Sequence, residues 1–171
     1  MKRLFVLRHA KSDWDDPGLA DHDRPLAARG RKGAGLLAAE FARLHLEVDM
    51  VLCSTARRAR DTLDLVRGAL PESTEVYFER RLYGAGAEDL IDRLHEVPDS
   101  DGSVMLVGHN PGLEDLVLDL APTEEAALVA RVEAKFPTAA FATIDLAVDR
   151  WTDVQPGTGT MVGFVTPGDL G

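Results

Sequence analysis

The sequence is poor in cysteine, and no apolar run in it is long enough to cross a membrane. Cys53 is the only cysteine among 171 residues, so no disulfide can form within the chain. The apolar stretch after the N-terminal Met-Lys-Arg is too short for a signal peptide, and no other segment reaches membrane-spanning length. We therefore expect a cytoplasmic protein in a reducing compartment, with Cys53 as a buried, unreactive thiol.

Basic residues are scarce relative to acidic ones. Nineteen Lys and Arg stand against 29 Asp and Glu, which gives a formal net charge of −10. Nonspecific binding to nucleic acid or to an anionic membrane needs a basic surface, so this balance argues against both partners. It leaves room for an anionic ligand, because a few converging arginines can outweigh the overall charge locally.

Apolar runs and helical patterns alternate along the chain. Short continuous apolar runs predict strands buried on both faces at 3–7, 50–54 and 103–108, with a weaker strand at 75–78. Helical patterns are found at 26–46, 56–70, 87–96, 111–120 and 124–136. Late strands are expected at 139–148 and 159–166, with a turn at 155–159. This alternation predicts an α/β protein, a three-layer α/β/α sandwich with a mainly parallel central sheet, in a single domain spanning 1–171.

Polar and cationic side chains follow three of the predicted strands. Arg8 and His9 follow the first strand, Ser54 ends the second, and His109 follows the third. Ligands of open α/β sheets bind beyond the carboxyl ends of the strands, where helix N-termini also favour anions. Two histidines, at least one arginine from each of two segments, and helix N-termini at one edge predict a phosphate pocket.

Several motifs resemble those of the histidine phosphatase superfamily, whose members share the phosphoglycerate-mutase-like fold. The Arg-His-Gly motif that follows the family's first strand reads Arg8-His9-Ala10 here. The segment STARRARDT (54–62) resembles the family's Ser-x-x-x-Arg-Ala-x-x-Thr pattern. The closer resemblance is to the short SixA-type branch of phosphohistidine phosphatases, and it is carried by RHAKSDW, DHDRPLAARG (21–30), RLYGAGAEDL (81–90), VGHNPGLEDL (107–116) and FPTAAFATIDL (136–146).

The resemblance implies catalytic roles for His9, Arg8, Arg58 and His109. His9 would be the nucleophile that forms a transient phosphohistidine, and the other three would be the phosphate-binding residues. A neutral imidazole nitrogen is a good nucleophile toward phosphorus. Neighbouring guanidinium groups keep it neutral by lowering its pKa, and they bind phosphoryl oxygens bidentately.

The choice among three neighbouring arginines depends on the resemblance. Helical periodicity turns Arg57 away from the apolar stripe and places Arg58 and Arg60 on opposite flanks, so it does not choose between these two. The family register, four residues after Ser54, selects Arg58.

Three carboxylates are candidates for the proton donor to the leaving group. In the SixA-type branch the resemblance implies Asp21, shortly before Arg-Pro-Leu, as a catalytic acid. In mutase-like members a glutamate after the third strand does this work, and Glu79 is the nearest match. Many members carry asparagine six residues after the nucleophile, where this chain has Asp15, the third candidate. A phosphoester needs such an acid, whereas a phosphoramidate leaves as an imidazole and needs less help.

The resemblance implies neither a metal nor a cofactor, and the residues support this expectation. Laid on the calcium-loop pattern, the acidic loop at 13–23 puts Pro17 at a ligand position and Arg24 at the required glutamate. No cysteine–histidine spacing indicates zinc, and the GxxxxGK[ST] phosphate loop is absent.

The function implied is that of a metal-independent phosphatase. Its substrate would be phosphohistidine on a protein, for example a histidine phosphotransfer domain, or a small phosphorylated metabolite. Two alternatives stay open: a noncatalytic phospho-ligand binding protein on the same scaffold, and a phosphoglycerate-mutase-type transferase. The short chain and Asp15 argue against the transferase. The sequence does not indicate an oligomeric state.

Overall fold

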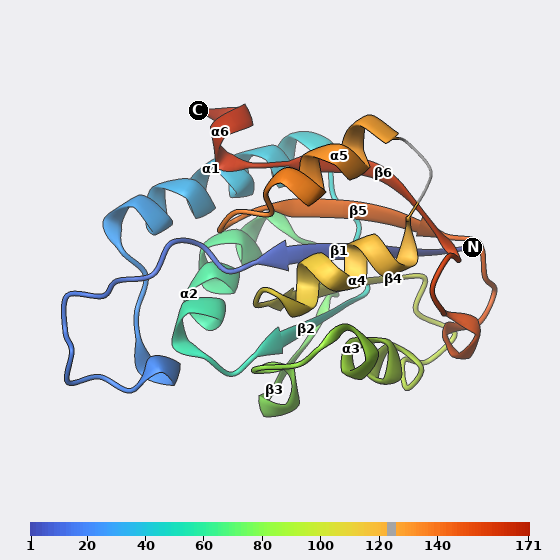
Figure 1. Cartoon of the computed structure of the whole chain (residues 1–171), viewed down its shortest axis with the longest axis horizontal. Helices are drawn as coiled ribbons and strands as arrows, with labels where there is room; N and C mark the ends of the chain where they lie inside the picture. Colours follow the sequence, from blue (N-terminus) through green and yellow to red (C-terminus); the bar gives the residue numbers. More distant parts are fainter. Residues whose placement is uncertain (123–125) are drawn as a thin grey trace.

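A six-stranded sheet runs through the centre of the computed structural model, which describes residues 1–122 and 126–171 (Figure 1). The strands are β1 (Lys2–Arg8), β2 (Met50–Ser54), β3 (Glu75–Glu79), β4 (Ser103–Gly108), β5 (Phe141–Leu146) and β6 (Gly159–Val165). Their order in the sheet is β3-β2-β4-β1-β5-β6. The first four strands in this order are parallel to one another, and β5 and β6 add an antiparallel edge.

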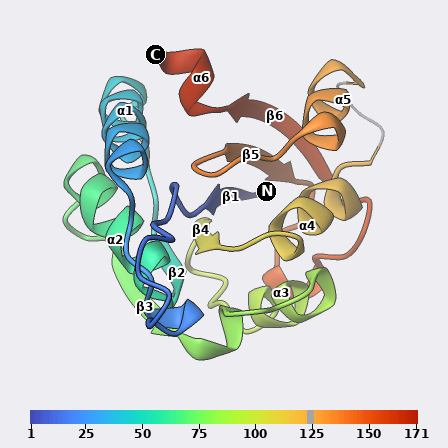
Figure 2. The same ribbon diagram turned by 60° about the vertical axis from the view of Figure 1, so that its left-hand side comes forward.

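Helices cover both faces of the sheet, because each parallel connection needs a crossover that returns the chain to the same end. The helices are α1 (Ala28–Leu44), α2 (Arg57–Val66), α3 (Ala87–Leu94), α4 (Gly112–Leu120), α5 (Ala126–Ala134) and α6 (Pro167–Leu170). Short 3-10 helices lie at Asp21–Asp23, Arg67–Ala69, Arg80–Leu82 and Trp151–Asp153. Figure 2 shows the sheet with α1, α2 and α6 on one side and α3, α4 and α5 on the other.

Alternating side chains of the central strands build a separate apolar core on each face. In β1, Leu4 and Val6 belong to the core beneath α3, α4 and α5, whereas Phe5 and Leu7 belong to the core beneath α1 and α2. All four are at most 2% exposed. Burial on both faces is why these strands read as continuous apolar runs rather than as alternating patterns.

The α/β/α sandwich and the mainly parallel sheet predicted from the sequence are confirmed. The boundaries of the described elements lie within two residues of the predicted ones, with one exception. The helix expected at 56–70 ends as an α-helix at Val66 and continues as a 3-10 turn, in which Gly68 is a poor helix former. The helix expected at 124–136 is α5, and its first two predicted residues lie outside the described residues.

The carboxyl ends of β1, β2 and β4 are level with one another. Arg8 is paired with Gly108, and Cys53 is paired with Val107. The residues that follow these strands are therefore gathered at one edge of the sheet. None of the helices formed by the described residues is long and apolar enough to cross a membrane.

Candidate active site

The main chain around His9 is held by three neighbouring segments. The His9 amide donates to the carbonyl of Gly108 at 3.0 Å, and its carbonyl accepts from the amide of Ala139 at 3.0 Å. The next amide, that of Ala10, donates to the Thr62 hydroxyl of α2 at 2.9 Å. Contacts to β4, α2 and the segment before β5 thus fix the position from which the His9 ring projects.

The His9 ring is buried and neutral, and its hydrogen bonding selects one tautomer. Nδ1 lies 2.7 Å from the Ala10 carbonyl oxygen, which can only accept, so Nδ1 carries the proton and Nε2 has a free lone pair. Burial lowers the His9 pKa to about 3, and His109, Arg58 and Arg8 add to the shift. His9 therefore presents an unprotonated Nε2 at neutral pH.

Arg8 and Arg58 place two guanidinium groups beside His9. Arg8 donates from Nη1 to the Phe136 carbonyl at 3.0 Å, and burial lowers its pKa. Arg58 donates from Nη1 and Nη2 to the carbonyl and carboxylate of Asp21, at 2.7 and 3.0 Å. The Nε of each arginine is buried without a protein partner, so both groups keep a donor for a ligand.

The structure places Arg58 in the pocket, and it places the two competing arginines elsewhere. Arg58 is 6% exposed. Arg57 is exposed and pairs with Asp61, with 3.5 Å between the nearest charged atoms. Arg60 is also exposed and donates from Nε to the Thr55 carbonyl. The register taken from the family pattern thus selects the arginine that reaches the site.

His109 lies beside His9, and its ring nitrogen without a protein partner is Nδ1, the opposite one from that of His9. The Ser54 hydroxyl accepts from the Ala56 amide at 3.2 Å and lies 2.8 Å from His109 Nε2. Ser54 is fully buried, and among the hydrogen bonds of the described residues His109 Nε2 is the one partner that can accept the hydroxyl proton. Ser54 therefore donates to Nε2, and the proton of the neutral ring lies on Nδ1. Burial, with Arg58 next, lowers the His109 pKa to about 4. His109 Nδ1 is then a neutral hydrogen-bond donor, with its ring centroid 5.2 Å from that of His9.

Three buried nitrogens without a hydrogen-bond partner belong to residues that line one pocket. Within residues 1–122 and 126–171, the buried side-chain nitrogen and oxygen atoms without a hydrogen-bond partner are Arg8 Nε, Arg58 Nε and His109 Nδ1. All three residues line a pocket of about 220 Å³ together with His9. Its other lining residues are Lys11, Ser12, Trp14, Arg24, Asn110 and Thr138. Donors left unsatisfied by the protein cost stability unless a ligand uses them, and these three suit a tetrahedral oxyanion.

Asp21 lies beside the pocket and binds Arg58 instead of lining the pocket itself. Its carboxylate also accepts from Arg24 Nε at 3.1 Å and from the Tyr83 hydroxyl. The Tyr83 hydrogen bond, followed by Arg58 and Arg24, holds the Asp21 pKa down at about 2. The proton-donor role of Asp21 stays a prediction, and an ionised carboxylate is a poor donor at neutral pH.

The other two candidate acids, Glu79 and Asp15, do not line the pocket either. Glu79 forms a bidentate pair with Arg93, with N–O distances of 2.7 and 2.9 Å. Asp15 is exposed in the loop after β1, where its amide donates to the Asp13 carboxylate. Among the residues whose structure is described, no carboxylate lines the 220 Å³ pocket. Nor does any group of three or more His, Cys, Asp or Glu side chains in that part of the chain form an arrangement that could hold a metal ion.

Sequence reasoning gave no role to Tyr83 or Thr62, although both lie in segments that carry the resemblance. Tyr83 touches Asp21 and packs its ring edge against His109, with 5.4 Å between ring centroids. Thr62 accepts from the Ala10 amide and donates to the Arg58 carbonyl at 2.7 Å, so it links the segment that carries His9 to α2. Their places in RLYGAGAEDL and STARRARDT were the available signal, but neither hydroxyl could be paired with a partner before the fold was known.

Comparisons with known proteins agree with this geometry. The family model for the histidine phosphatase superfamily (branch 1) matches residues 4–89. An uncharacterised protein of Mycobacterium tuberculosis is 43% identical, covering 94% of this chain and 99% of that protein. Phosphohistidine phosphatase SixA of Escherichia coli is 28% identical, covering 98% and 96%. A solved structure of the protein histidine phosphatase SixA complexed with tungstate superposes with a TM-score of 0.77 at 26% identity, covering 99% of both chains.

Proposed function

Because the chain belongs to the histidine phosphatase superfamily, we propose that it hydrolyses phosphohistidine on a partner protein through a covalent intermediate on His9. The observation that carries the proposal is the pairing of a neutral His9 with three unsatisfied donors around one pocket. Two relatives support it: E. coli SixA is a phosphohistidine phosphatase, and the solved SixA structure holds tungstate, a tetrahedral oxyanion like phosphate.

In the first step the lone pair on His9 Nε2 attacks phosphorus. The bond from phosphorus to the substrate imidazole breaks, and its electron pair returns to that imidazole nitrogen. Arg8, Arg58 and His109 donate to the three phosphoryl oxygens, and the two arginines offset their negative charge. The phosphorylated His9 ring keeps its Nδ1 proton and is therefore cationic, and the Ala10 carbonyl 2.7 Å away stabilises that charge.

In the second step a water molecule attacks the same phosphorus. The bond to His9 Nε2 breaks, its electron pair returns to the ring, and the water proton leaves with phosphate or passes to solvent. His9 returns to its neutral tautomer, because the Ala10 carbonyl has held the Nδ1 proton throughout. Both steps use the same donors, so one pocket serves formation and breakdown of the intermediate.

The pocket favours cleavage of a phosphorus–nitrogen bond over that of a phosphorus–oxygen bond. An alkoxide leaving group needs a proton donor, whereas a phosphorylated imidazole that is protonated on its other nitrogen leaves as neutral imidazole. No carboxylate from the described part of the chain lines the pocket, and Asp21, which binds Arg58, has its pKa held near 2. We infer that phosphohistidine is a better substrate than an alkyl phosphomonoester.

The test compares wild type with His9→Ala on a histidine-phosphorylated protein, with a chelator present throughout. His45→Asn, a change at an exposed histidine that follows α1, is the matched control. We expect wild type and the control to release phosphate, and His9→Ala to lose about a thousandfold or more of the rate. Acid quenching of wild type with labelled substrate should trap an acid-labile label on His9.

Four outcomes would contradict the proposal. Full activity in His9→Ala would show that the nucleophile lies elsewhere. Phosphate binding without turnover of any substrate would favour a noncatalytic binding protein. Transfer of the label between positions of a phosphoglycerate, instead of release to water, would favour a mutase-type transferase. Loss of activity on chelation would show that a metal takes part.

A further inference from the structure

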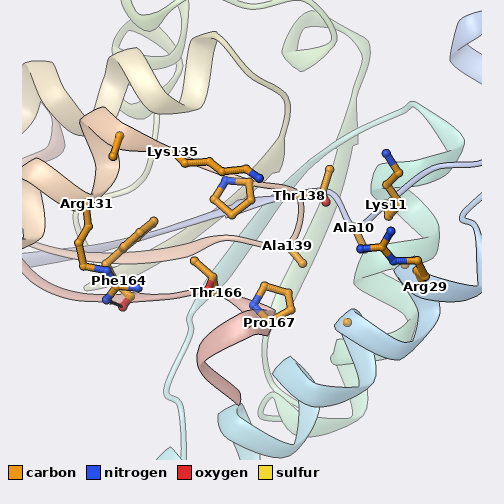
Figure 3. Close-up of a pocket in the computed structure, with 15 residues that line it drawn as sticks. Ala10, Lys11, Arg29, Arg131, Lys135, Thr138, Ala139, Phe164, Thr166 and Pro167 are labelled. Carbon is orange, nitrogen blue, oxygen red and sulfur yellow. Dashed lines mark hydrogen bonds between the residues drawn. The ribbon is translucent and has the colours of Figure 1, made fainter. Parts of the chain in front are cut away.

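A second hollow, larger than the catalytic pocket, lies directly beside it. It has a volume of about 550 Å³ and is drawn in Figure 3. The two hollows share Lys11 and Thr138 in their linings. Its walls come from the loop after β1, the start of α1, the segment joining α5 to β5, and the junction of β6 with α6. A ligand that reaches the phosphoryl site can therefore extend into this groove without leaving the surface.

The charge of the groove is opposite to that of the whole chain. Lys11, Arg29 and Lys135 are exposed along it, and none of them takes part in an ion pair with another described residue. A fourth cation, Arg131, is paired with Asp169, with N and O 2.7 Å apart. No Asp or Glu in the described ranges lines the groove, although the chain carries a formal charge of −10.

Apolar surface lies between the cations. Figure 3 shows Lys135 on one side, Lys11 and Arg29 on the other, and Thr138, Ala139 and Pro167 between them. Further apolar lining comes from Ala134, Pro137 and Phe164. A compact phosphorylated metabolite would leave most of this groove of about 550 Å³ unfilled. It would also place its hydroxyl groups on apolar surface. A peptide can place acidic side chains on the cations at both sides and its apolar atoms against the floor.

We propose that this groove docks an acidic peptide segment of the partner protein, next to the phosphohistidine that enters the catalytic pocket. The inference rests on the proposed function for its substrate, and it adds the chemistry by which that substrate is chosen. Docking through exposed cations is expected to act on association, and hence on KM, more than on kcat. Added salt should weaken it by screening the charges.

The test uses two synthetic peptides phosphorylated on one histidine, one flanked by glutamates and the other by glutamines at the same positions. The enzyme variant Arg29→Gln/Lys135→Gln removes two groove cations without touching the catalytic pocket. Its matched control, Lys32→Gln/Arg67→Gln, removes the same charge from exposed positions that do not line the groove. Binding of the unphosphorylated glutamate peptide, carrying a fluorophore, is measured separately by anisotropy.

We expect wild type and the control to prefer the glutamate peptide by about tenfold in kcat/KM at low salt, and the groove variant to lower this ratio toward one. The labelled peptide should bind the groove variant about tenfold more weakly than it binds wild type. An equal preference in all three proteins, or equal binding, would overturn the docking proposal.

Failure of the catalytic proposal would look different. If wild type hydrolyses neither peptide but binds the labelled glutamate peptide through Arg29 and Lys135, the groove assignment stands and the proposed reaction falls. Free 3-phosphoglycerate serves as a compact anionic competitor. If only its binding weakens in the groove variant, the groove takes a small molecule and the peptide proposal is wrong.

Discussion

Two histidines in one pocket are set to opposite hydrogen-bonding states by their nearest neighbours. The Ala10 carbonyl keeps the proton of His9 on Nδ1, whereas donation by the Ser54 hydroxyl to Nε2 leaves that of His109 on Nδ1, which has no protein partner. One ring thereby offers a lone pair, and the other offers a donor. The sequence predicted both histidines, but it could not predict their tautomers, which depend on where a carbonyl and a hydroxyl lie after folding.

The contacts of Asp21 predict a positioning role for this residue, which a substitution can test. In the structure it holds Arg58 through its carbonyl and its carboxylate, so we expect Asp21→Asn to loosen Arg58 and raise KM about tenfold for every phosphorylated substrate. The measurement compares a phosphohistidine peptide with phenyl phosphate, whose leaving group needs a proton. If Asp21 positions Arg58, kcat/KM should fall by a similar factor for both substrates, mainly through a higher KM. The shape of the pH profile should not change.

A catalytic acid at Asp21 would behave otherwise. The loss would be confined to phenyl phosphate, would fall on kcat by about a hundredfold or more, and would remove one limb of the pH profile. Tyr83→Phe is a useful companion, because it removes a hydrogen bond from the Asp21 carboxylate and leaves the carboxylate in place. We expect it to show a weaker form of the KM effect.

Among the secondary-structure elements, the ends of β1, β2 and β4 position the polar residues of the pocket. The apolar runs predicted β1, β2 and β4, and the ends of these strands brought Arg8, His9, Ser54 and His109 together as expected. The packing of the loops could not be predicted in the same way. Tyr83 reaches Asp21 from the 3-10 turn at Arg80–Leu82, a contact between segments 62 positions apart that no local pattern encodes.

The start of α1 supports the loop that carries His9, and a glycine makes this approach possible. A Cβ on Gly30 would lie 2.0 Å from the Lys11 carbonyl oxygen, which accepts from the Ala27 amide at 2.9 Å. Gly30→Ala must therefore displace backbone two residues from His9. We expect it to lower the free energy of unfolding by about 1–3 kcal/mol and to lower kcat/KM.

A second glycine on the same helix is the control for this prediction. Nothing lies within 4 Å of a Cβ built on Gly35. Gly35→Ala should raise the free energy of unfolding by about 0.5–1 kcal/mol, because alanine loses less entropy in a helix, and it should leave activity unchanged. Urea unfolding and steady-state kinetics on both variants test the pair. If Gly30→Ala were as stable and active as Gly35→Ala, α1 would not support the loop that carries His9.

Across the whole molecule, net charge and local charge point in opposite directions. The formal charge of −10 was a sound reason to expect no nonspecific binding to nucleic acid. A net charge does not show where cations cluster, and it gave no sign of the cationic site or of the cationic groove. The strand ends and the family register predicted which residues gather around the 220 Å³ pocket. They did not predict the groove, because Lys11, Arg29 and Lys135 come from three separate segments with no shared pattern. Only the folded arrangement shows that they face one space.

Burial of two neutral histidines makes the stability of the whole protein depend on pH. The pKa of His9 is lowered to about 3 and that of His109 to about 4, both from 6.5. Between these values and 6.5 the unfolded chain binds protons that the folded protein excludes. The stability gained by keeping both histidines neutral is fully present above pH 6.5, and it is lost as the pH falls to about 4 for His109 and to about 3 for His9. Each histidine costs about 1.4 kcal/mol per pH unit in this window, or about 2 kcal/mol between pH 6.5 and 5.

Urea unfolding at pH 7 and pH 5 measures this linkage directly. We expect wild type to lose about 4 kcal/mol of unfolding free energy between the two, and His9→Asn to lose only about half as much because one of the two groups is gone. His45→Asn, which changes an exposed histidine, should follow wild type. Asp21 does not disturb the comparison, because its lowered pKa of about 2 places its own loss of stability at more acidic pH. Equal losses in wild type and His9→Asn would mean that His9 is not held neutral by burial, and the lone pair assigned to its Nε2 would then have to come from another source.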